Sequence, residues 1–417
     1  MSVLYVCHGH PSLARGGGEL AAWRLYEYFN GVEGYGNCGF LAAAPTPQHL
    51  PPGCQVMALG PRQWLIKPSA NAVIHDTAVS LRDDEALHQA LIGMAPRLIH
   101  LHHYLHVGLD LLLALKRWFP GVPVLLTLHD YWGPCAYEGR LLRRSGALCE
   151  GGNPDACNVC LGGDRRDQLA IRSLRLQRFF AAVDHFLAPS YFLKRQYLHW
   201  GLPPQRVSVV ENLPPPAPLK LPALPAIHPG LVLGYFGQIN PWKGLDLILE
   251  AVALARDHGI AVRLEIHGLD GNTLAERARS SEDFWCRLDD LCRELGPDGA
   301  VAMGRYEPDQ LAERMAGLDA LVMGSIWYEN SPMVIQEAYR HGVPVLAPRL
   351  GGMAEKVRDG HNGLLFSPGD SGALAGAITR LARTIGLREC LRRQAKDVGF
   401  RAAHAGLLHE RIYTRLA

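Results

Sequence analysis

Two glutamates, eight positions apart, flank the start of a predicted helix. Glu329 lies in the loop before that helix, and Glu337 falls in its second turn. Ser331 is a typical N-cap residue and Pro332 suits the first helical position. A helix N-terminus offers N–H groups and a positive dipole end to a phosphate, and carboxylates accept hydrogen bonds from hydroxyls. A nucleotide sugar carries both groups. The alternative is a surface helix with two solvated glutamates.

The sequence around the two carboxylates predicts a strand on each side of the helix. The apolar run Leu321-Val322-Met323 comes first, and the run Gly342-Val343-Pro344-Val345-Leu346-Ala347 follows the helix and leads to a Gly351-Gly352 turn. Strand, loop, helix and strand form a βαβ unit, whose ligands lie at the carboxyl ends of the strands. We therefore expect the carboxylates, the helix start and the glycine pair to line one site.

The two carboxylates belong to a longer ordered set of motifs. Its other members are Gly342-Val343-Pro344-Val345, Gly351-Gly352, Glu355 and Gly360-His361-Asn362-Gly363-Leu364-Leu365. The set resembles the C-terminal domain of glycosyltransferase family 4, with the core of the likeness over residues 234–370. The resemblance implies an α/β protein of the GT-B fold, with two Rossmann-like doubly wound domains facing a central cleft. It also implies transfer of a sugar from a nucleoside diphosphate sugar to a hydroxyl of a glycan or lipid-linked glycan, with retention.

In such an enzyme, which would serve cell-surface polysaccharide or glycoconjugate biosynthesis, this segment holds the donor. Glu337 would bind the ribose hydroxyls and Glu329, as a catalytic residue, would face the transferred sugar. The leaving diphosphate would be held by Lys243, by Asn330-Ser331-Pro332-Met333 and by Gly351-Gly352. These groups stabilise the charge of the leaving group, so no cofactor is expected for catalysis. No residue is placed as a nucleophile, which favours attack from the same face.

The loop Gly237-Gln238-Ile239-Asn240-Pro241-Trp242-Lys243-Gly244 departs from the family in one position. The resemblance implies an arginine and a lysine that clamp the donor pyrophosphate. Lys243 matches the lysine, but Gln238 stands where the arginine is usual. A neutral hydrogen bond contributes roughly 0.5–1.5 kcal/mol against about 1.5–3 kcal/mol for a charged one. Gln238 therefore keeps a second hypothesis open, a catalytically silent sugar-nucleotide-binding subunit. A GT-B sugar-nucleotide epimerase is a third, which the E-x7-E spacing disfavours.

The N-terminal part of the chain offers a glycine loop and a histidine. Arg15-Gly16-Gly17-Gly18-Glu19 lies between a predicted strand and a helix expected to begin near Glu19. In the family such a loop approaches the donor phosphate, which assigns Gly17 and Gly18 to donor binding; the alternative is an ordinary tight turn. His129, followed by Asp130, ends an apolar strand. The resemblance places it in the sugar pocket, so we assign it to sugar positioning; the alternative is a structural, hydrogen-bonded histidine.

Two further groups of residues remain open. The histidines at positions 100, 102, 103 and 106 are assigned to the acceptor side in preference to a metal. Four cysteines, Cys135, Cys149, Cys157 and Cys160, lie in a glycine-rich loop and include one C-x-x-C pair. Four thiolates can hold one tetrahedral zinc, although the gap between the first two is atypical. A structural zinc and unligated or redox-active thiols both remain possible readings of this loop.

Residues 165–183 predict a helix with a stripe of apolar residues. The stripe consists of Leu169, Leu176, Phe180 and Val183, and the arginines are Arg165, Arg166, Arg172, Arg175 and Arg178. A core-packed helix with a solvated basic face explains this pattern. The alternative is adhesion of the basic face to anionic lipid at the inner side of the membrane.

The whole chain reads as two α/β domains. The 417 residues are 48% hydrophobic, and the net charge of +2 predicts no nucleic-acid partner. No apolar run is long enough for a membrane span and no signal peptide is evident, so a cytoplasmic location is expected. Proline-rich residues 213–229 predict a linker. This divides the chain into an acceptor-side domain (1–212) with a cysteine-bearing insertion (133–163), a nucleotide-sugar-binding domain (230–394) and a C-terminal helix (395–417) that returns to the first domain.

Overall fold

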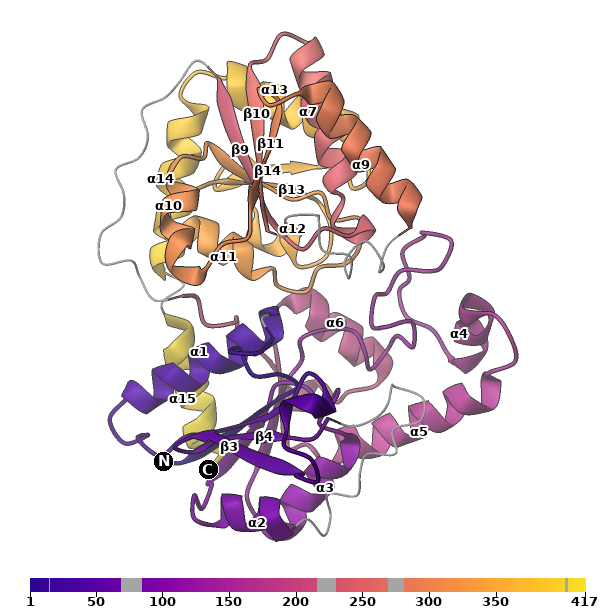
Figure 1. Cartoon of the computed structure of the whole chain (residues 1–417), viewed down its shortest axis with the longest axis vertical. Coiled ribbons are helices and arrows are strands. Elements are labelled where there is room, and N and C mark those ends of the chain that lie inside the picture. The colour runs from indigo at the N-terminus through magenta and orange to yellow at the C-terminus, as the bar shows by residue number, and fades with distance from the viewer. Residues whose placement is uncertain (15, 69–84, 216–229, 269–280, 402–403) are drawn as a thin grey trace. The chain divides into compact units, whose positions relative to one another are not determined.

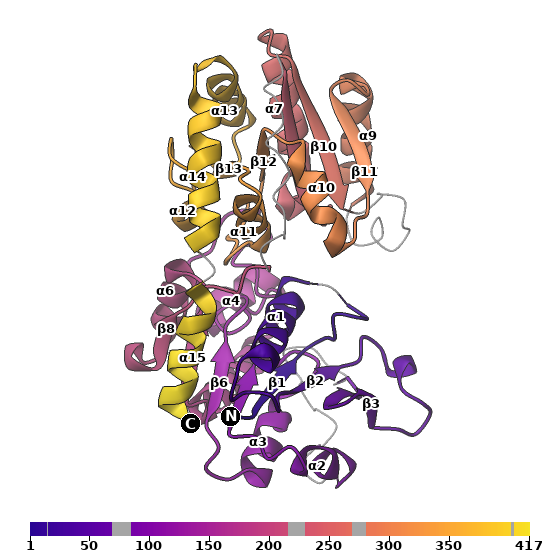
Figure 2. The same ribbon diagram turned by 90° about the vertical axis from the view of Figure 1, so that its left-hand side faces the viewer.

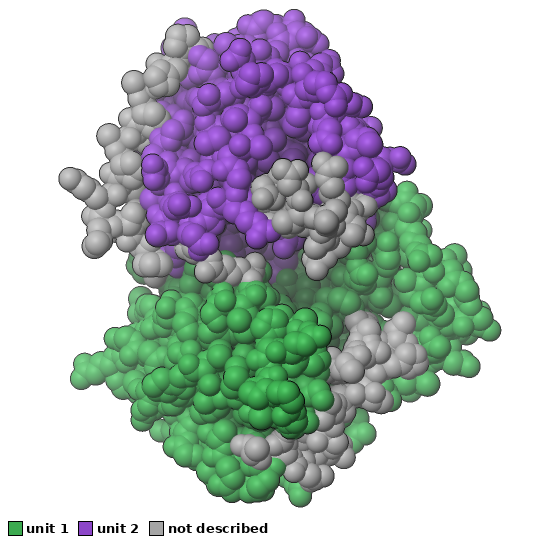
Figure 3. Space-filling model, viewed as in Figure 1, with its two compact units in different colours: residues 1–213, 404–417 green, residues 214–403 purple. Residues whose placement is uncertain are grey.

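The computed structural model describes residues 1–14, 16–68, 85–215, 230–268, 281–401 and 404–417. The chain forms two compact units, shown in green and purple in Figure 3. Unit 1 consists of residues 1–213 and 404–417, and unit 2 of residues 214–403. Residues 216–229, most of the predicted linker, lie outside the described residues.

Unit 1 is built on an eight-stranded sheet in the order β3-β4-β2-β1-β5-β6-β7-β8. The strands are β1 (Val3–Cys7), β2 (Gly39–Ala43), β3 (Val56–Gly60), β4 (Gln63–Ile66), β5 (Leu98–Leu101), β6 (Val124–Thr127), β7 (His185–Ala188) and β8 (Val207–Val209). All neighbours are parallel except β3 and β4. Because β2 lies on one side of β1 and β5 on the other, the strand order reverses beside β1, where ligands of such sheets bind.

Helices cover both faces of this sheet (Figures 1 and 2). They are α1 (Gly17–Gly31), α2 (Glu85–Ile92), α3 (Leu109–Trp118), α4 (Pro154–Leu161), α5 (Arg166–Ala182), α6 (Tyr191–Trp200) and α15 (Ala405–Leu416), with single turns η1 (Pro47–His49) and η3 (Pro204–Arg206). Helices α1 and α15 share one core with alternate residues of β1, and the rings of Phe29 and Tyr413 lie 4.8 Å apart there. Helix α1 begins at Gly17, two residues before the predicted start.

Unit 2 is built on a six-stranded parallel sheet in the order β11-β10-β9-β12-β13-β14. The strands are β9 (Leu231–Gly237), β10 (Val262–Gly268), β11 (Ala300–Gly304), β12 (Ala320–Val322), β13 (Val345–Pro348) and β14 (Gly363–Phe366). In chain order this is the 3-2-1-4-5-6 arrangement of a doubly wound dinucleotide-binding fold. The order reverses between β9 and β12, which places the expected ligand crevice at their carboxyl ends.

The helices of unit 2 pack on this sheet and on one another. They are α7 (Leu245–Asp257), α9 (Glu282–Leu295), α10 (Leu311–Ala316), α11 (Met333–Arg340), α12 (Met353–Lys356), α13 (Ser371–Arg383) and α14 (Leu387–Arg401), with turns η4 (Pro241–Lys243) and η5 (Pro308–Gln310). Helices α7, α9 and α13 share one apolar core with the sheet, and α11 packs against α14. None of the described helices of the chain is long and apolar enough to cross a membrane.

The predicted C-terminal helix 395–417 is two helices in the structure. Helix α14 already begins at Leu387 and belongs to unit 2, and α15 begins at Ala405 and belongs to unit 1. The chain therefore returns to the first unit near residue 403, and the returning helix is the shorter α15. Tyr413 on α15 fixes it there, because its hydroxyl lies 2.6 Å from Nδ1 of buried His100 on β5.

Candidate active site

The loop after β9 places Lys243 at the reversal point of the unit 2 sheet. Asn240 caps the turn η4, because its Oδ1 accepts a hydrogen bond from the Lys243 N–H at 3.2 Å. Gly244 follows in the left-handed conformation, with φ 62°. A Cβ at Gly244 would lie 2.1 Å from the Gly324 carbonyl oxygen, so this loop packs directly on the chain that leaves β12. Only glycine allows that approach.

Lys243 contacts Glu329 at this point. One carboxylate oxygen, Oε1 of Glu329, accepts hydrogen bonds from Lys243 Nζ at 2.6 Å, Ser325 Oγ at 2.9 Å and Trp327 Nε1 at 3.1 Å. Glu329 is 8% exposed. Three donors on one buried oxygen fix the carboxylate. The bond from Lys243 links the residue that the sequence assigns to the diphosphate with Glu329, which it assigns to the sugar.

The glycine pair Gly351-Gly352 supports the Glu329 loop. The Gly352 N–H donates to the Glu329 carbonyl oxygen at 2.8 Å. A Cβ at Gly352 would lie 1.6 Å from the Asn330 carbonyl oxygen, and Gly351 has φ 53°. The sequence assigned both glycines to the diphosphate. The structure gives Gly352 a different task, because its amide already holds the Glu329 loop.

Helix α11 begins one residue later than predicted. Its first residue is Met333 and Pro332 occupies the N-cap position with ψ 118°, so Ser331 is not the cap. Glu337 lies in the second turn, as expected, and is 8% exposed. Burial, reinforced by the charge of Glu337, raises the pKa of Tyr306, which lies just after β11. Gly342 stops the helix with φ 70°.

Aromatic side chains meet at the carboxyl ends of β9, β10 and β11. Phe236 stacks on His267 at 4.2 Å between ring centroids and meets Tyr306 edge-on at 5.4 Å. A flat apolar surface beside a carboxylate suits a nucleoside, whose base stacks and whose ribose offers hydroxyls. The sequence analysis missed these three residues, although His267 ends an apolar strand as His129 does. Gln238 is exposed, and its carbonyl oxygen accepts from the Tyr235 hydroxyl at 2.6 Å.

In unit 1, His129 lies at the carboxyl end of β6. Its Nε2 is 3.0 Å from Nδ1 of His102, which follows β5. Burial, reinforced by the charge of His103, lowers the pKa of His129 to about 3, so its ring is neutral at physiological pH. A Cβ at Gly18 would lie 3.1 Å from the His8 ring and 3.7 Å from the His129 ring. The glycine loop therefore packs against His129, which the sequence analysis did not foresee.

A histidine and a glutamate form a pair beside the glycine loop. His8 Nε2 lies 3.0 Å from Glu19 Oε1. Burial opposes the protonation of His8, but the neighbouring Cys7 thiol and Glu19 outweigh it and hold the pKa of His8 well above its usual range. The ring of His103 lies 4.7 Å from that of His8. Sequence reasoning missed His8 and Glu19, although His8 directly follows the apolar strand β1.

His103 bonds to the Asp130 carboxylate through Nε2. Its Nδ1 accepts from the Leu105 N–H at 2.8 Å, which assigns the proton to Nε2. Burial would raise the pKa of Asp130, but the charge and hydrogen bond of His103 outweigh it and lower that pKa. Asp130 also accepts from the Trp132 N–H at 2.8 Å. The contact between His103 and Asp130 thus ties the chain that follows β5 to the chain that follows β6.

His100 takes a structural role and not the acceptor-side role that the sequence suggested. It is fully buried between the Tyr413 hydroxyl and Thr127 Oγ1, at 2.6 and 2.7 Å. Both ring nitrogens are therefore used to tie α15 to the sheet.

The helix predicted over 165–183 is α5, and one of its arginines is not on the basic face. Arg172 is 6% exposed and donates to the carbonyl oxygens of Trp132, Gly133 and Cys135. The predicted apolar stripe is buried. Arg165, Arg166, Arg175 and Arg178 remain exposed.

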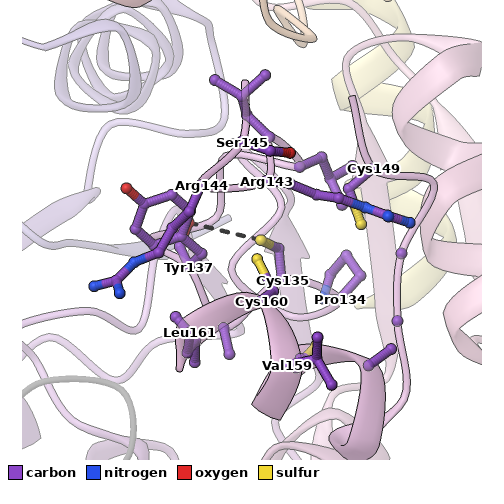
Figure 4. A pocket seen from close by; sticks show the side chains of 17 residues that line it. Pro134, Cys135, Tyr137, Arg143, Arg144, Ser145, Cys149, Val159, Cys160 and Leu161 are labelled. Atoms are coloured by element: carbon purple, nitrogen blue, oxygen red, sulfur yellow. Dashed lines mark hydrogen bonds between the residues drawn. The ribbon is translucent and has the colours of Figure 1, made fainter. Parts of the chain in front are cut away.

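The four cysteines of the insertion line one cavity of about 480 Å³, and all are free thiols (Figure 4). Within the described parts of the chain, no three His, Cys, Asp or Glu side chains already stand at metal-ligand spacing.

The fold defines an α/β protein of two units, each built on a mostly parallel, doubly wound sheet. The description "Glycosyltransferase Family 4" matches residues 68–213, and "Glycosyl transferases group 1" matches residues 230–384. A relative named D-inositol 3-phosphate glycosyltransferase, from Streptomyces bingchenggensis, is 28% identical over 74% of this chain and 62% of its own length. The chain thus spans under two thirds of that relative.

Two solved structures show the same fold. Sucrose-phosphate synthase from Thermosynechococcus elongatus is 18% identical with a TM-score of 0.70, over 100% of this chain and 99% of its own. Anabaena HepE, in complex with UDP and glucose, is 17% identical with a TM-score of 0.65, over 99% and 98%. The two matches together cover most of the chain, which belongs to glycosyltransferase family 4 and has the GT-B fold.

Proposed function

We propose that the chain transfers a sugar from a nucleoside diphosphate sugar to a hydroxyl of a glycan or lipid-linked glycan, with retention at the anomeric carbon. The observation that carries this proposal is the contact between Lys243 and Glu329 at the reversal point of the unit 2 sheet. It puts a cation for a diphosphate and a carboxylate for sugar hydroxyls side by side. The work belongs to the synthesis of a cell-surface polysaccharide or glycoconjugate.

On the donor side, Lys243 exchanges Glu329 for the diphosphate when the donor binds. A charged hydrogen bond to the leaving group stabilises the negative charge that grows on it in the transition state. The first amides of α11 and the positive end of its dipole add to this stabilisation. Glu329, released from Lys243, accepts hydrogen bonds from the sugar, and Glu337 accepts from the ribose. The base stacks on the Phe236–Tyr306 aromatic group.

On the acceptor side, neutral His129 positions the transferred sugar. A ring with a pKa of about 3 does not take a proton at neutral pH, which argues against His129 as a general base. The leaving diphosphate can accept the proton of the attacking hydroxyl in a same-face attack. The proposal thus assigns catalysis to Glu329, Lys243 and His129 and needs no cofactor.

Nucleotide binding tests the donor site directly. UDP, GDP and ADP are each added to the wild type and to Glu337→Ala, and the Tm of each mixture is measured by thermal unfolding. UDP is the first probe, because HepE was solved with it. A ligand at a hundredfold excess over its Kd stabilises by about 2.7 kcal/mol. We expect one diphosphate to stabilise the wild type far more than Glu337→Ala. Glu313→Ala, an exposed residue of α10, is the matched control. If the diphosphate stabilises Glu337→Ala as much as the wild type, Glu337 does not bind the ribose.

Turnover separates the enzyme from a silent subunit. We expect release of the nucleoside diphosphate from a donor sugar in the presence of a glycan acceptor, and its loss in Glu329→Ala. Nucleotide binding without turnover of any donor would favour the silent-subunit hypothesis, for which Gln238 is the motive.

We further propose that the exposed basic side of α5 rests on an anionic membrane surface. Ile171 and Leu174 are 49% and 66% exposed on this helix, beside Arg175 and Arg178. Apolar and basic side chains together suit a lipid headgroup layer, at about 1 kcal/mol per basic residue. Co-sedimentation with vesicles that contain an anionic lipid is expected for the wild type and not for Arg175→Glu/Arg178→Glu. Sedimentation that is unchanged in this variant would contradict the proposal.

A further inference from the structure

The loop between β6 and α5 contains four cysteines that the proposed transfer reaction does not use. Cys135, Cys149, Cys157 and Cys160 lie up to 25 positions apart in the sequence, yet all line the same cavity. Figure 4 shows three of them around this cavity. The fourth, Cys157, belongs to the same lining.

The four cysteines lie on three different local structures: a capped helix, a small hairpin and a turn. Helix α4 carries two of them, Cys157 and Cys160, which lie on one side because they are three positions apart. Asn153 caps this helix by accepting from the Ala156 N–H at 2.9 Å, and Pro154 occupies its first turn. The helix is therefore held in register by local signals, and its register turns both thiols toward the cavity.

The other two cysteines come from a small hairpin and from a turn. A bridge between Leu142 and Leu148 closes the hairpin, and the Cys149 N–H donates to the Leu141 carbonyl at 2.8 Å. Cys135 follows the β6 strand end, where its N–H donates to the Tyr131 carbonyl at 2.8 Å. Arg172 of α5 donates a hydrogen bond to the Cys135 carbonyl oxygen at 3.4 Å.

This loop buries little apolar surface of its own. Leu142 and Leu161 are buried at its two ends and line the cavity, but no side chain from residue 143 to residue 160 is buried. Small segments that cannot bury enough apolar surface are usually held by disulfides or by a structural metal. All four cysteines are free thiols, so disulfides do not hold this one.

We propose that Cys135, Cys149, Cys157 and Cys160 together bind one zinc ion as a structural tetrathiolate site. Four thiolates match the tetrahedral preference of Zn²⁺, with Zn–S distances of about 2.3 Å. Each thiol loses its proton to solvent as its Zn–S bond forms, so four protons leave and no electron is transferred. The side chains close on the ion by rotation, and Cys135 Sγ leaves the Tyr137 carbonyl, from which it is 3.6 Å away.

The zinc has a consequence for the active site, through Arg172. This side chain donates to the carbonyls of Trp132, Gly133 and Cys135, which directly follow Asp130. A staple on the cysteine loop therefore fixes the chain that leads away from His129. The inference itself does not rest on the proposed function, because metal content is measured without turnover.

The test begins with the metal content of the wild-type chain, purified without chelator. Mass spectrometry of the metals is expected to find about one zinc per chain. Stepwise modification of thiols with a mercurial reagent, followed with a zinc-sensitive dye, is expected to release that zinc as the site's thiols react. Substitution with Co²⁺ is expected to give the intense bands of a tetrahedral, sulfur-ligated ion. These measurements on the wild type do not depend on any variant that fails to fold.

Variants then locate the site. Cys157→Ser and Cys160→Ser are expected to lose most of the zinc. Cys54→Ser and Cys286→Ser are the matched controls, because both cysteines are exposed and neither lines the cavity. They are expected to keep it. A metal-free wild type, a disulfide found between Cys157 and Cys160, iron in place of zinc, or full zinc retention in Cys157→Ser would each overturn the proposal.

Discussion

Lys243 and Glu329 lie 86 positions apart in the chain, and their charged groups meet at 2.6 Å. The contact depends on two loops that leave β9 and β12 on opposite sides of the reversal point of the sheet. It also depends on Gly244 and Gly324, whose backbones pack against each other. A buried carboxylate with a lysine partner is stable while no anion competes for that lysine. A diphosphate is such a competitor, which makes the pair a natural donor-binding device.

Replacement of Lys243 tests this exchange. We expect Lys243→Ala to raise the KM for the donor by roughly ten- to a hundredfold, because a charged hydrogen bond contributes about 1.5–3 kcal/mol. The variant also leaves Glu329 without its cation, so a lower Tm is expected. Steady-state kinetics with varied donor and a thermal melt measure the two effects. Lys396→Ala, exposed on α14, is the control. A donor KM that does not change would remove Lys243 from the diphosphate site.

Restoring the family's arginine gives the opposite expectation. Gln238 is exposed at the end of β9, in the same loop as Lys243. We expect Gln238→Arg to tighten binding of the nucleoside diphosphate about three- to tenfold, because a charged donor replaces a neutral one. Calorimetric titration of the diphosphate measures this, and the gain should shrink at high salt. Gln238→Lys separates the bidentate geometry of arginine from charge alone. If neither variant binds more tightly, this position does not contact the diphosphate.

The sequence predicts part of the two sheets, where a strand is a short apolar run bounded by glycine, proline or a polar cluster. The runs predicted at residues 321–323 and 342–347, for example, coincide with β12 and β13. It does not predict β2, β3, β4, β8 or β11, whose runs are less distinct. It predicts the candidate site in part. Glu329, Lys243 and His129 each lie in the loop that follows such a run, and the rule that ligands lie at strand ends finds them. The same rule applied to His8 would have found the contact with Glu19.

Other features could not be predicted because they depend on three-dimensional packing. The Gly352 N–H donates to the Glu329 carbonyl oxygen, and this contact exists only because the loops of Glu329 and Gly352 pack against each other in the fold. Arg172 was placed on the solvated face because it is charged. It lies three positions after Leu169 and four before Leu176, within the apolar stripe, and the carbonyls that accept its hydrogen bonds make burial favourable. The charge of Arg172 therefore predicts its exposure wrongly, whereas its position along the helix predicts its burial.

Gly352 offers a test of the close approach between two loops. We expect Gly352→Ala to destabilise the chain by about 2 kcal/mol or more, since its Cβ would lie 1.6 Å from a backbone oxygen. The neighbour is backbone, so no side-chain rotation relieves the overlap. Gly376→Ala on α13 is the matched control, because no atom lies within 4 Å of its Cβ position. That variant should be neutral or more stable by about 0.5–1 kcal/mol. Urea unfolding measures the free energy of unfolding of both variants. Equal stability of Gly352→Ala and Gly376→Ala would contradict the close approach of the two loops.

Unit 1 should lose stability on mild acidification. Burial lowers the pKa of His129 to about 3, and of His185 and His409 to about 4. In the unfolded chain each has a pKa of about 6.5, so the unfolded state binds more protons between that value and about pH 4. The free energy of unfolding therefore falls as the pH falls through this window, and the contribution of these three histidines is at its full value above about pH 6.5.

His409 is the clearest group with which to measure this effect, because it is 2% exposed and donates to the Ala405 carbonyl at 2.8 Å. We expect His409→Leu to flatten the dependence of the unfolding free energy on pH by up to about 1.4 kcal/mol per pH unit between pH 6 and pH 4.5. The slope is the readout, since the lost hydrogen bond lowers stability equally at every pH. His199→Leu, exposed on α6, is expected to leave the slope as it is in the wild type. Urea midpoints at four pH values decide, and a slope unchanged in His409→Leu would show that this histidine is not held neutral by the fold.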